Sequence, residues 1–90
     1  MQLDDLLARY FGVADPSLAS PSAFDAGIER ALVDLGLERD RGKGFALWSM
    51  LHLLGRAPEL DVTFKHDDDR EAARNLMDMM AASEAAVSSD

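Results

Sequence analysis

The chain has 90 residues, which is enough for one small domain with a modest hydrophobic core. It contains no cysteine, which excludes disulfides, thiolate zinc sites and cysteine nucleophiles, and two histidines are too few for a histidine-rich metal cage. Its net charge of −8 matches a polyanion poorly, so the sequence predicts no nucleic-acid partner.

The sequence gives no sign of a targeting or membrane segment. Its first residues are acidic where a secretory signal would be basic. Its longest apolar run, Phe45 to Leu54, is interrupted by Ser49 and His52 and is shorter than the roughly 20 residues that cross a bilayer. We therefore predict no membrane partner and a cytoplasmic location.

The first predicted helix runs from about Leu3 to Phe11. Its apolar residues recur at the three- and four-residue spacing that places them on one stripe. Acidic residues in the first turn suit the helix dipole, and we expect Gly12 to end the helix in a left-handed conformation. A loop is predicted from Val13 to about Pro21.

A second helix is predicted to follow this loop, and two starting points compete. Ser22 with Asp25 has the spacing of a capping box, whereas Ser20 as the cap would place Pro21 at the first helical position. The helix continues with a second apolar stripe, and Gly36 is expected to cap its end.

The third predicted helix covers about residues 40–54, with Asp40 as its N-cap and Gly55 at its end. Its apolar residues occupy an arc of roughly 160° on a helical wheel. Trp48 extends this surface, and we expect it to be buried. A helix this apolar is expected to lie at the centre of the fold.

Residues 56–66 show a mixed pattern. Leu60, Val62 and Phe64 alternate with polar residues, as in a β-strand. The chain offers no second strand, and an unpaired strand would leave its backbone groups unsatisfied. We therefore predict irregular or short helical structure, because a strand here would need the same strand of a second copy.

A fourth helix is predicted to start at the Asp67–Asp69 run, with Asp67 as its N-cap, and to continue to about Ala86. The fold class is thus all-α, with about four helices packed around the central helix at residues 40–54. We predict a single domain over residues 1–86 and a frayed tail at 87–90.

Two polar clusters favour structural roles over ligand binding. The run formed by His66 and the three aspartates after it lacks the alternating ligands, the glycine and the closing glutamate of a calcium loop, so no metal is predicted. Residues 39–44 are basic and contain glycine ahead of a helix, but their glycine spacing is wrong for a phosphate-binding P-loop. No cofactor is predicted.

The third helix carries a polar strip formed by Arg41, Ser49, His52 and Arg56. The spacing of Ser49 and His52 would allow a nucleophile and its base, but no carboxylate or oxyanion hole accompanies them. We therefore predict no catalytic residues and no enzyme. His52 is expected to stack beside Trp48, and the strip is at most a weak ligand or partner contact.

A second candidate surface favours a homodimer. The alternating residues Leu60, Val62 and Phe64 have no partner strand within the chain, and Met77 lies at the rim of its helix stripe. We predict these four residues as an oligomer contact with Phe64 near its centre, and a monomer stays open as the alternative.

The sequence does not identify a function. A helix-turn-helix interpretation fails because the third helix offers almost no donors for base edges. The best prediction is a small acidic, non-catalytic protein-interaction or regulatory module. The alternative is a small-ligand or anion-binding accessory protein that uses the polar strip. The partner, the ligand and the pathway stay open.

Overall fold

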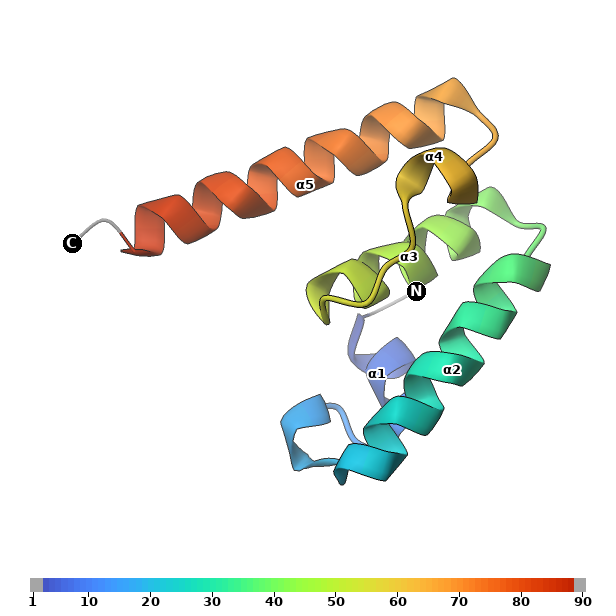
Figure 1. Cartoon of the computed structure of the whole chain (residues 1–90), viewed down its shortest axis with the longest axis vertical. Helices are drawn as coiled ribbons and strands as arrows, with labels where there is room; N and C mark the ends of the chain where they lie inside the picture. The colour runs from blue at the N-terminus through green and yellow to red at the C-terminus, as the bar shows by residue number, and fades with distance from the viewer. Residues whose placement is uncertain (1–2, 89–90) are drawn as a thin grey trace. The chain divides into compact units, whose positions relative to one another are not determined.

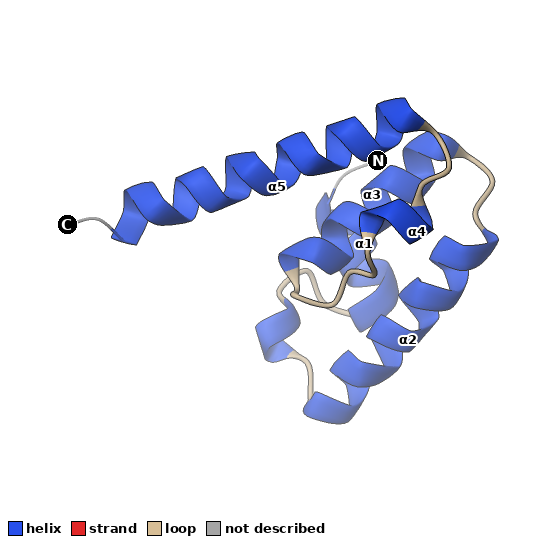
Figure 2. Cartoon of the chain, turned by 45° about the horizontal axis from the view of Figure 1, so that its top comes forward, coloured by secondary structure: helices blue, strands red, loops and turns tan. Residues whose placement is uncertain are grey.

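The computed structural model describes the backbone of residues 3–88 and the side chains of residues 3–83. Every regular element in that range is helical and none is a strand, as Figure 1 and Figure 2 show. The predicted all-α fold class is confirmed. The chain forms two compact units, each defined by the contacts among its own residues: an N-terminal unit, Met1–Pro58, and a C-terminal unit, Glu59–Asp90. The single domain over residues 1–86 stays a prediction.

The N-terminal unit consists of three α-helices that contact one another pairwise, with one turn of 3₁₀-helix in the first connection. The C-terminal unit consists of a short helix and a long one. In chain order the elements are α1 (Leu3–Phe11), η1 (Pro16–Leu18), α2 (Pro21–Leu37), α3 (Arg41–Leu53), α4 (Leu60–Thr63) and α5 (Asp67–Ser88).

The ends of α1 and α3 follow the sequence prediction. Gly12 and Gly55 have φ values of 77° and 74°, the left-handed conformation that glycine adopts without steric cost. At the start of α3, the Asp40 carboxylate accepts the backbone N–H of Lys43 at 3.0 Å, which is the N-cap contact. The predicted helix ends at Gly12 and Gly55 and the predicted N-cap at Asp40 are therefore confirmed.

The ends of α2 correct two predictions. Ser20 is the N-cap and its hydroxyl accepts the N–H of Ala23 at 3.2 Å, so the capping box at Ser22 is wrong. Pro21 decides the start, because its fixed φ suits the first helical position. Gly36 does not cap the helix: it lies within α2 without a positive φ, and Glu38 follows as the C-cap.

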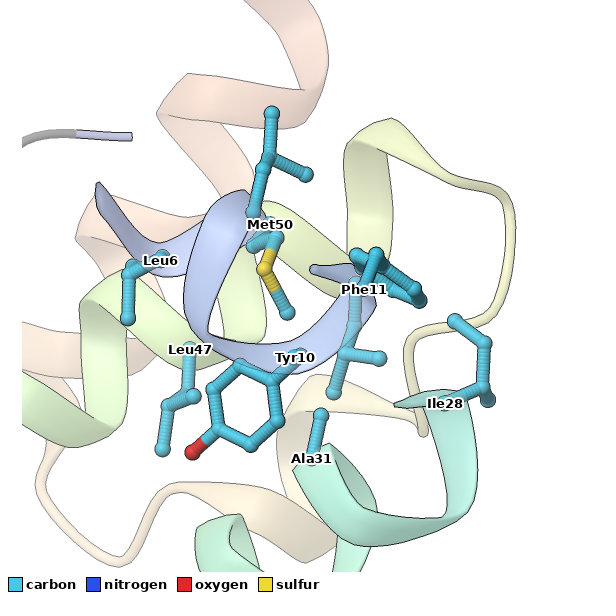
Figure 3. Packing of buried hydrophobic residues seen from close by; sticks show 9 residues of the cluster. Leu6, Tyr10, Phe11, Ile28, Ala31, Leu47 and Met50 are labelled. Atoms are coloured by element: carbon cyan, nitrogen blue, oxygen red, sulfur yellow. The ribbon is translucent and has the colours of Figure 1, made fainter. Parts of the chain in front are cut away.

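The core of the N-terminal unit forms where α1, α2 and α3 meet (Figure 3). Each helix contributes residues at the three- and four-residue spacing that defines one face. Leu53 and Leu32 are 52% and 38% exposed, so the apolar stripes of α3 and α2 are narrower than predicted. The buried cluster comprises Leu6, Leu7, Tyr10, Phe11, Ile28, Ala31, Leu47, Met50 and Leu51.

Gly27 allows α2 to approach α1 closely. A Cβ atom at this position would lie 2.5 Å from the Phe11 ring and 2.6 Å from the backbone oxygen of Tyr10. A Cβ atom does not make non-bonded contacts this short, and the backbone oxygen belongs to a packed helix that cannot move easily. The packing of α1 on α2 therefore depends on the missing side chain.

In the C-terminal unit, the short helix α4 explains the alternating pattern of residues 56–66. Residues four apart lie on the same side of a helix, so Leu60 and Phe64 share a side while Val62 points away. Phe64 is accordingly 6% exposed and Val62 is 80% exposed. The prediction of short helical structure is confirmed, and no strand forms among residues 56–66.

The start of α5 corrects the predicted N-cap. The helix begins at Asp67, and the carbonyl of His66 accepts the N–H groups of Asp69 and Arg70 at 3.1 Å, so His66 occupies the cap position. Asp67 instead lies in the first turn, where its charge favours the helix dipole. Of the predicted tail, 87 and 88 belong to α5, while 89 and 90 lie outside the described residues.

Candidate functional site

The predicted polar strip on α3 is engaged in contacts within the helix. The Ser49 hydroxyl donates to the carbonyl of Phe45 at 2.8 Å, and the His52 ring stacks on Trp48 with the ring centroids 5.1 Å apart. No hydrogen bond joins Ser49 to His52 among the described side chains. The structure thus shows the predicted stacking of His52 and no nucleophile–base contact.

Trp48 anchors the end of α3 to the segment that follows it. Its side chain is 1% exposed, and its Nε1 donates to the carbonyl of Pro58 at 3.0 Å. The buried indole therefore has a partner for its N–H group, as a buried tryptophan requires. The predicted burial of Trp48 is confirmed.

The two arginines of the strip lie apart. Arg41 is exposed in the first turn of α3, whereas Arg56 follows Gly55 and has left the helix. The Arg56 guanidinium lies over the Phe24 ring, 5.5 Å from its centroid, and 4.0 Å from a carboxylate oxygen of Asp25. Arg56 thus contacts α2, and the four residues do not form one continuous strip along α3.

A polar site that the sequence analysis missed lies between α1 and α2. The Tyr10 hydroxyl donates to Oδ2 of Asp34 at 2.6 Å, and Tyr10 is 5% exposed. The guanidinium groups of Arg9 and Arg30 lie 5.9 and 5.8 Å from the centroid of the Tyr10 ring. Arg30 also donates to the carbonyl of Arg9 at 3.1 Å.

This environment holds the Tyr10 hydroxyl in its protonated form. Burial disfavours the charged phenolate, and the hydrogen bond to Asp34 and the negative charge of that carboxylate add to the effect. Together they raise the pKa of Tyr10 to about 12, although Arg9 and Arg30 oppose the shift. Tyr10 is therefore a hydrogen-bond donor that ties α1 to α2, and not a base or nucleophile near neutral pH.

An open depression of about 270 Å³ lies beside Tyr10 and Asp34. Its charged lining combines Arg9 and Lys43 with Asp34 and Glu38, two groups of each sign, so the lining has no net charge that would favour an anion or a cation. The one buried polar group beside it, the Tyr10 hydroxyl, already has a partner in Asp34. No buried side-chain donor or acceptor among the described residues is left without a partner, so the depression offers a ligand only exposed charged groups.

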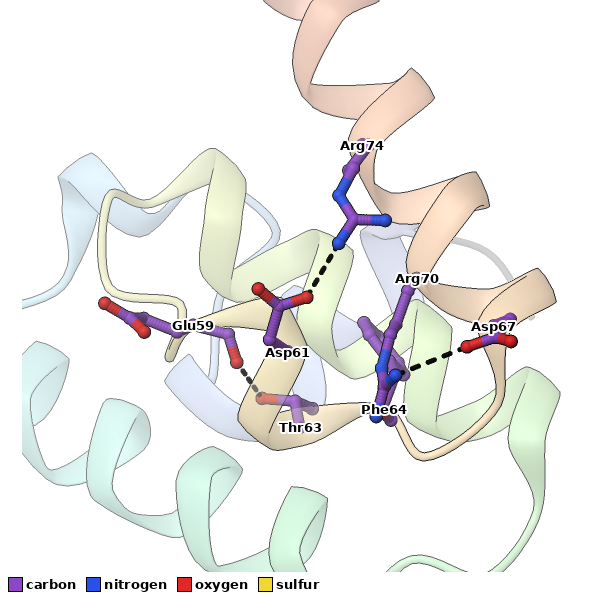
Figure 4. A network of polar contacts seen from close by, with 7 residues as sticks. All are labelled: Glu59, Asp61, Thr63, Phe64, Asp67, Arg70 and Arg74. Carbon is purple, nitrogen blue, oxygen red and sulfur yellow. Dashed lines mark hydrogen bonds and ion pairs between the residues drawn. The ribbon is translucent and has the colours of Figure 1, made fainter.

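A polar network joins α4 to the first turns of α5 (Figure 4). Arg74 Nη2 lies 2.8 Å from Oδ1 of Asp61, and Arg70 Nη1 lies 3.3 Å from Oδ1 of Asp67. Arg70 also donates from Nε to the carbonyl of Phe64 at 2.7 Å. Both arginines of α5 are therefore occupied by partners in their own unit.

The residues predicted as an oligomer contact differ in exposure. Phe64 is buried and Leu60 is half-buried, because both lie on the same side of α4. Val62 and Met77 are exposed, and Met79, which the periodicity placed on the stripe of α5, is 64% exposed. A homodimer stays a prediction, but the position of Phe64 does not suit the centre of its interface.

Comparisons with known proteins give no relative for this chain: no family model, no curated protein and no solved structure matches it. Among the described residues, no helix has the length and apolar character needed to span a membrane. No three acidic or histidine side chains within that part of the chain converge into a metal-binding cluster.

Proposed function

We propose that the protein is a non-catalytic protein-interaction module whose binding surface lies on α5. The observation that carries the proposal is the exposure of Met79 on this helix, at 64%. Of the side chains described on α5, only Ala73 is fully buried. Flexible thioether side chains suit a surface that adapts to a partner.

The alternative, a ligand-binding accessory protein, receives less support. Ser49 donates a hydrogen bond to the Phe45 carbonyl, and His52 stacks on the Trp48 ring. Arg56 contacts Phe24 of α2. A ligand at Ser49 or His52 would have to displace these contacts within α3. We therefore keep the interaction module as the proposed function.

Site-specific cross-linking tests this proposal. A photoreactive phenylalanine derivative replaces Met79 in one variant and Leu37, which is 75% exposed on α2, in a matched control. Irradiation in native lysate should give a discrete product from position 79 that is absent from position 37. An excess of unmodified protein should suppress this product.

A second competitor makes the result specific to the α5 surface. Unlabelled Met79→Asp protein should fail to suppress the product, whereas unlabelled Leu37→Asp protein should suppress it as well as the wild type does. Equal suppression by both variants, or the absence of any product from position 79, would contradict the proposed function.

A further inference from the structure

The two units differ in charge as well as in packing. Residues 59–90 contain nine acidic and three basic residues, a net charge of −6 out of the −8 of the whole chain. Residues 1–58 contain eight acidic and six basic residues. The acidic character of the protein is therefore concentrated in the unit that carries the exposed methionines.

The basic residues of α5 do not neutralise this charge on the exposed side of the helix. Arg74 pairs with Asp61, and Arg70 contacts Asp67 and a backbone carbonyl. Three other acidic residues of α5 are exposed and make no ion pair within the described part of the chain: Asp68, Glu71 and Asp78.

Helical geometry places these acids near Met79. At 100° per residue, positions 68, 72, 75 and 79 fall within a sector of roughly 60°, and positions 71 and 78 lie about 40° and 60° beyond one edge of it. Ala72 and Asn75 in this sector are exposed, as is Met79. The result is a strip that contains Asp68, Ala72, Asn75 and Met79, with Glu71 and Asp78 along one side of it.

We propose that this strip of α5 binds a basic amphipathic helix of a partner protein, an inference that rests on the proposed function. The apolar face of such a helix would cover Met79 and Ala72, as one amphipathic helix packs on another in a coiled coil. Its Lys and Arg side chains would meet Asp68, Glu71 and Asp78, and this complementary charge sets the choice of partner.

A second copy of the chain fits this strip poorly. Two α5 helices packed through it would bring the same three carboxylates of each copy together, and close like charges oppose association. A basic partner removes this repulsion and replaces it with attraction. The charge of the C-terminal unit therefore favours a different protein as the occupant.

The test measures binding of defined peptides to the full-length protein by fluorescence anisotropy. The probe is a labelled helical peptide of about 18 residues in which Leu forms one face and Lys the other, long enough for about five turns. The comparison peptide has Glu in place of every Lys. The Leu/Lys peptide should bind saturably with an affinity that falls as salt rises, and the Leu/Glu peptide should bind at least tenfold more weakly.

Variants locate the binding surface. Met79→Ser should weaken binding of the Leu/Lys peptide about fivefold or more, and the Glu71→Gln/Asp78→Asn double variant should weaken it and flatten its salt dependence. Leu37→Ser, on the exposed part of α2, should leave it unchanged. Circular dichroism confirms that each variant keeps its helix content, which is expected because all the substituted residues are exposed.

Four results would overturn the inference: no binding of the Leu/Lys peptide, equal binding of both peptides, equal loss of binding with Met79→Ser and Leu37→Ser, or a protein mass that doubles with concentration while peptide binding is lost. The last result would assign the strip to a second copy. If the cross-link at position 79 forms but no Leu/Lys peptide binds, the proposed function holds and only the partner's chemistry is wrong. If the peptide binds but no cross-link forms, the proposed function itself fails.

Discussion

The N-terminal and C-terminal units place their apolar residues differently. Nine residues of α1, α2 and α3 form one buried cluster, whereas among the described residues of the C-terminal unit only Phe64 and Ala73 are buried. The first unit is also nearly balanced in charge, and the second carries most of the negative charge. The difference indicates that α1–α3 supply the stability of a scaffold while α5 presents residues that contribute little to stability.

Truncating a buried side chain of the N-terminal unit should have the largest effect on stability. We expect Leu51→Ala to lower the free energy of unfolding by about 2–5 kcal/mol, because Leu51 is fully buried and its loss leaves a cavity. The matched truncation in the C-terminal unit, Met79→Ala, should cost less than about 0.5 kcal/mol since that side chain is mostly exposed.

Urea denaturation followed by Trp48 emission and by circular dichroism measures both variants. Trp48 and Tyr10 both lie in the N-terminal unit, so emission reports on that unit, whereas circular dichroism reports on all helices. Similar losses from Leu51→Ala and Met79→Ala would remove the contrast between the two units.

Adding one methyl group should test the close approach of α1 and α2. We expect Gly27→Ala to cost about 1–3 kcal/mol, because the new Cβ would overlap the Phe11 ring and the Tyr10 carbonyl. Gly36→Ala is the matched control: it lies on the same helix with no atom within 4 Å of the new Cβ, and should stabilise by about 0.4–1 kcal/mol. Thermal melts of the two variants should move in opposite directions, and a shift in the same direction would contradict the packing.

Raising the pH should lower the stability of the N-terminal unit, because the Tyr10 hydroxyl loses its proton. The pKa of Tyr10 rises from 10.0 in the unfolded chain to about 12 in the folded protein, so the folded state holds its proton more tightly. The stabilisation is complete below pH 10 and is lost as the pH rises through 12, a total loss of at most about 3 kcal/mol.

The titration of Tyr10 can be followed directly. Tyr10 is the only tyrosine of the chain, so the absorbance of tyrosinate reports on this one hydroxyl. Tyr10→Phe should remove the part of the pH dependence that lies between 10 and 12. A tyrosine that titrates near pH 10 in the folded protein would show that the contact with Asp34 does not persist.

The smallest effect is expected in the polar network of the C-terminal unit. Arg74→Gln removes the ion pair with Asp61, in which both side chains are more than half exposed, so we expect a loss below about 1 kcal/mol. High salt should reduce this loss further, because exposed charges are screened. A loss as large as that of Leu51→Ala would mean that polar contacts, and not burial, hold α4 to α5.

The sequence predicted the structural features that depend only on neighbouring residues, such as the ends of helices. The glycine after Phe11 and the aspartate before Arg41 cap their helices as expected, because a cap needs only the few residues around it. The errors at Ser22 and Asp67 are of the same local kind: the actual cap lies one or two residues before the predicted one, at Ser20, the competing start, and at His66.

What the sequence did not reveal depends on residues far apart in the chain. Tyr10 and Asp34 are 24 positions apart, and no periodicity relates them. Arg56 appeared to belong to the polar strip because a helical wheel continues past Gly55, whereas the backbone turns there and brings Arg56 to Phe24. The exposure of Met79 likewise depends on how much of α5 other residues cover, which its own spacing does not determine.

The contact between position 27 and position 11 also has an evolutionary consequence. A side chain at position 27 is incompatible with a phenylalanine at position 11 in this arrangement of α1 and α2. A smaller residue at position 11 would relieve only the overlap with the ring, because the Tyr10 carbonyl oxygen would still lie 2.6 Å from the new Cβ. Any descendant of this sequence that gains a side chain at position 27 is therefore expected to move α1 away from α2 as well, with changes at position 11 and at other contacts between the two helices.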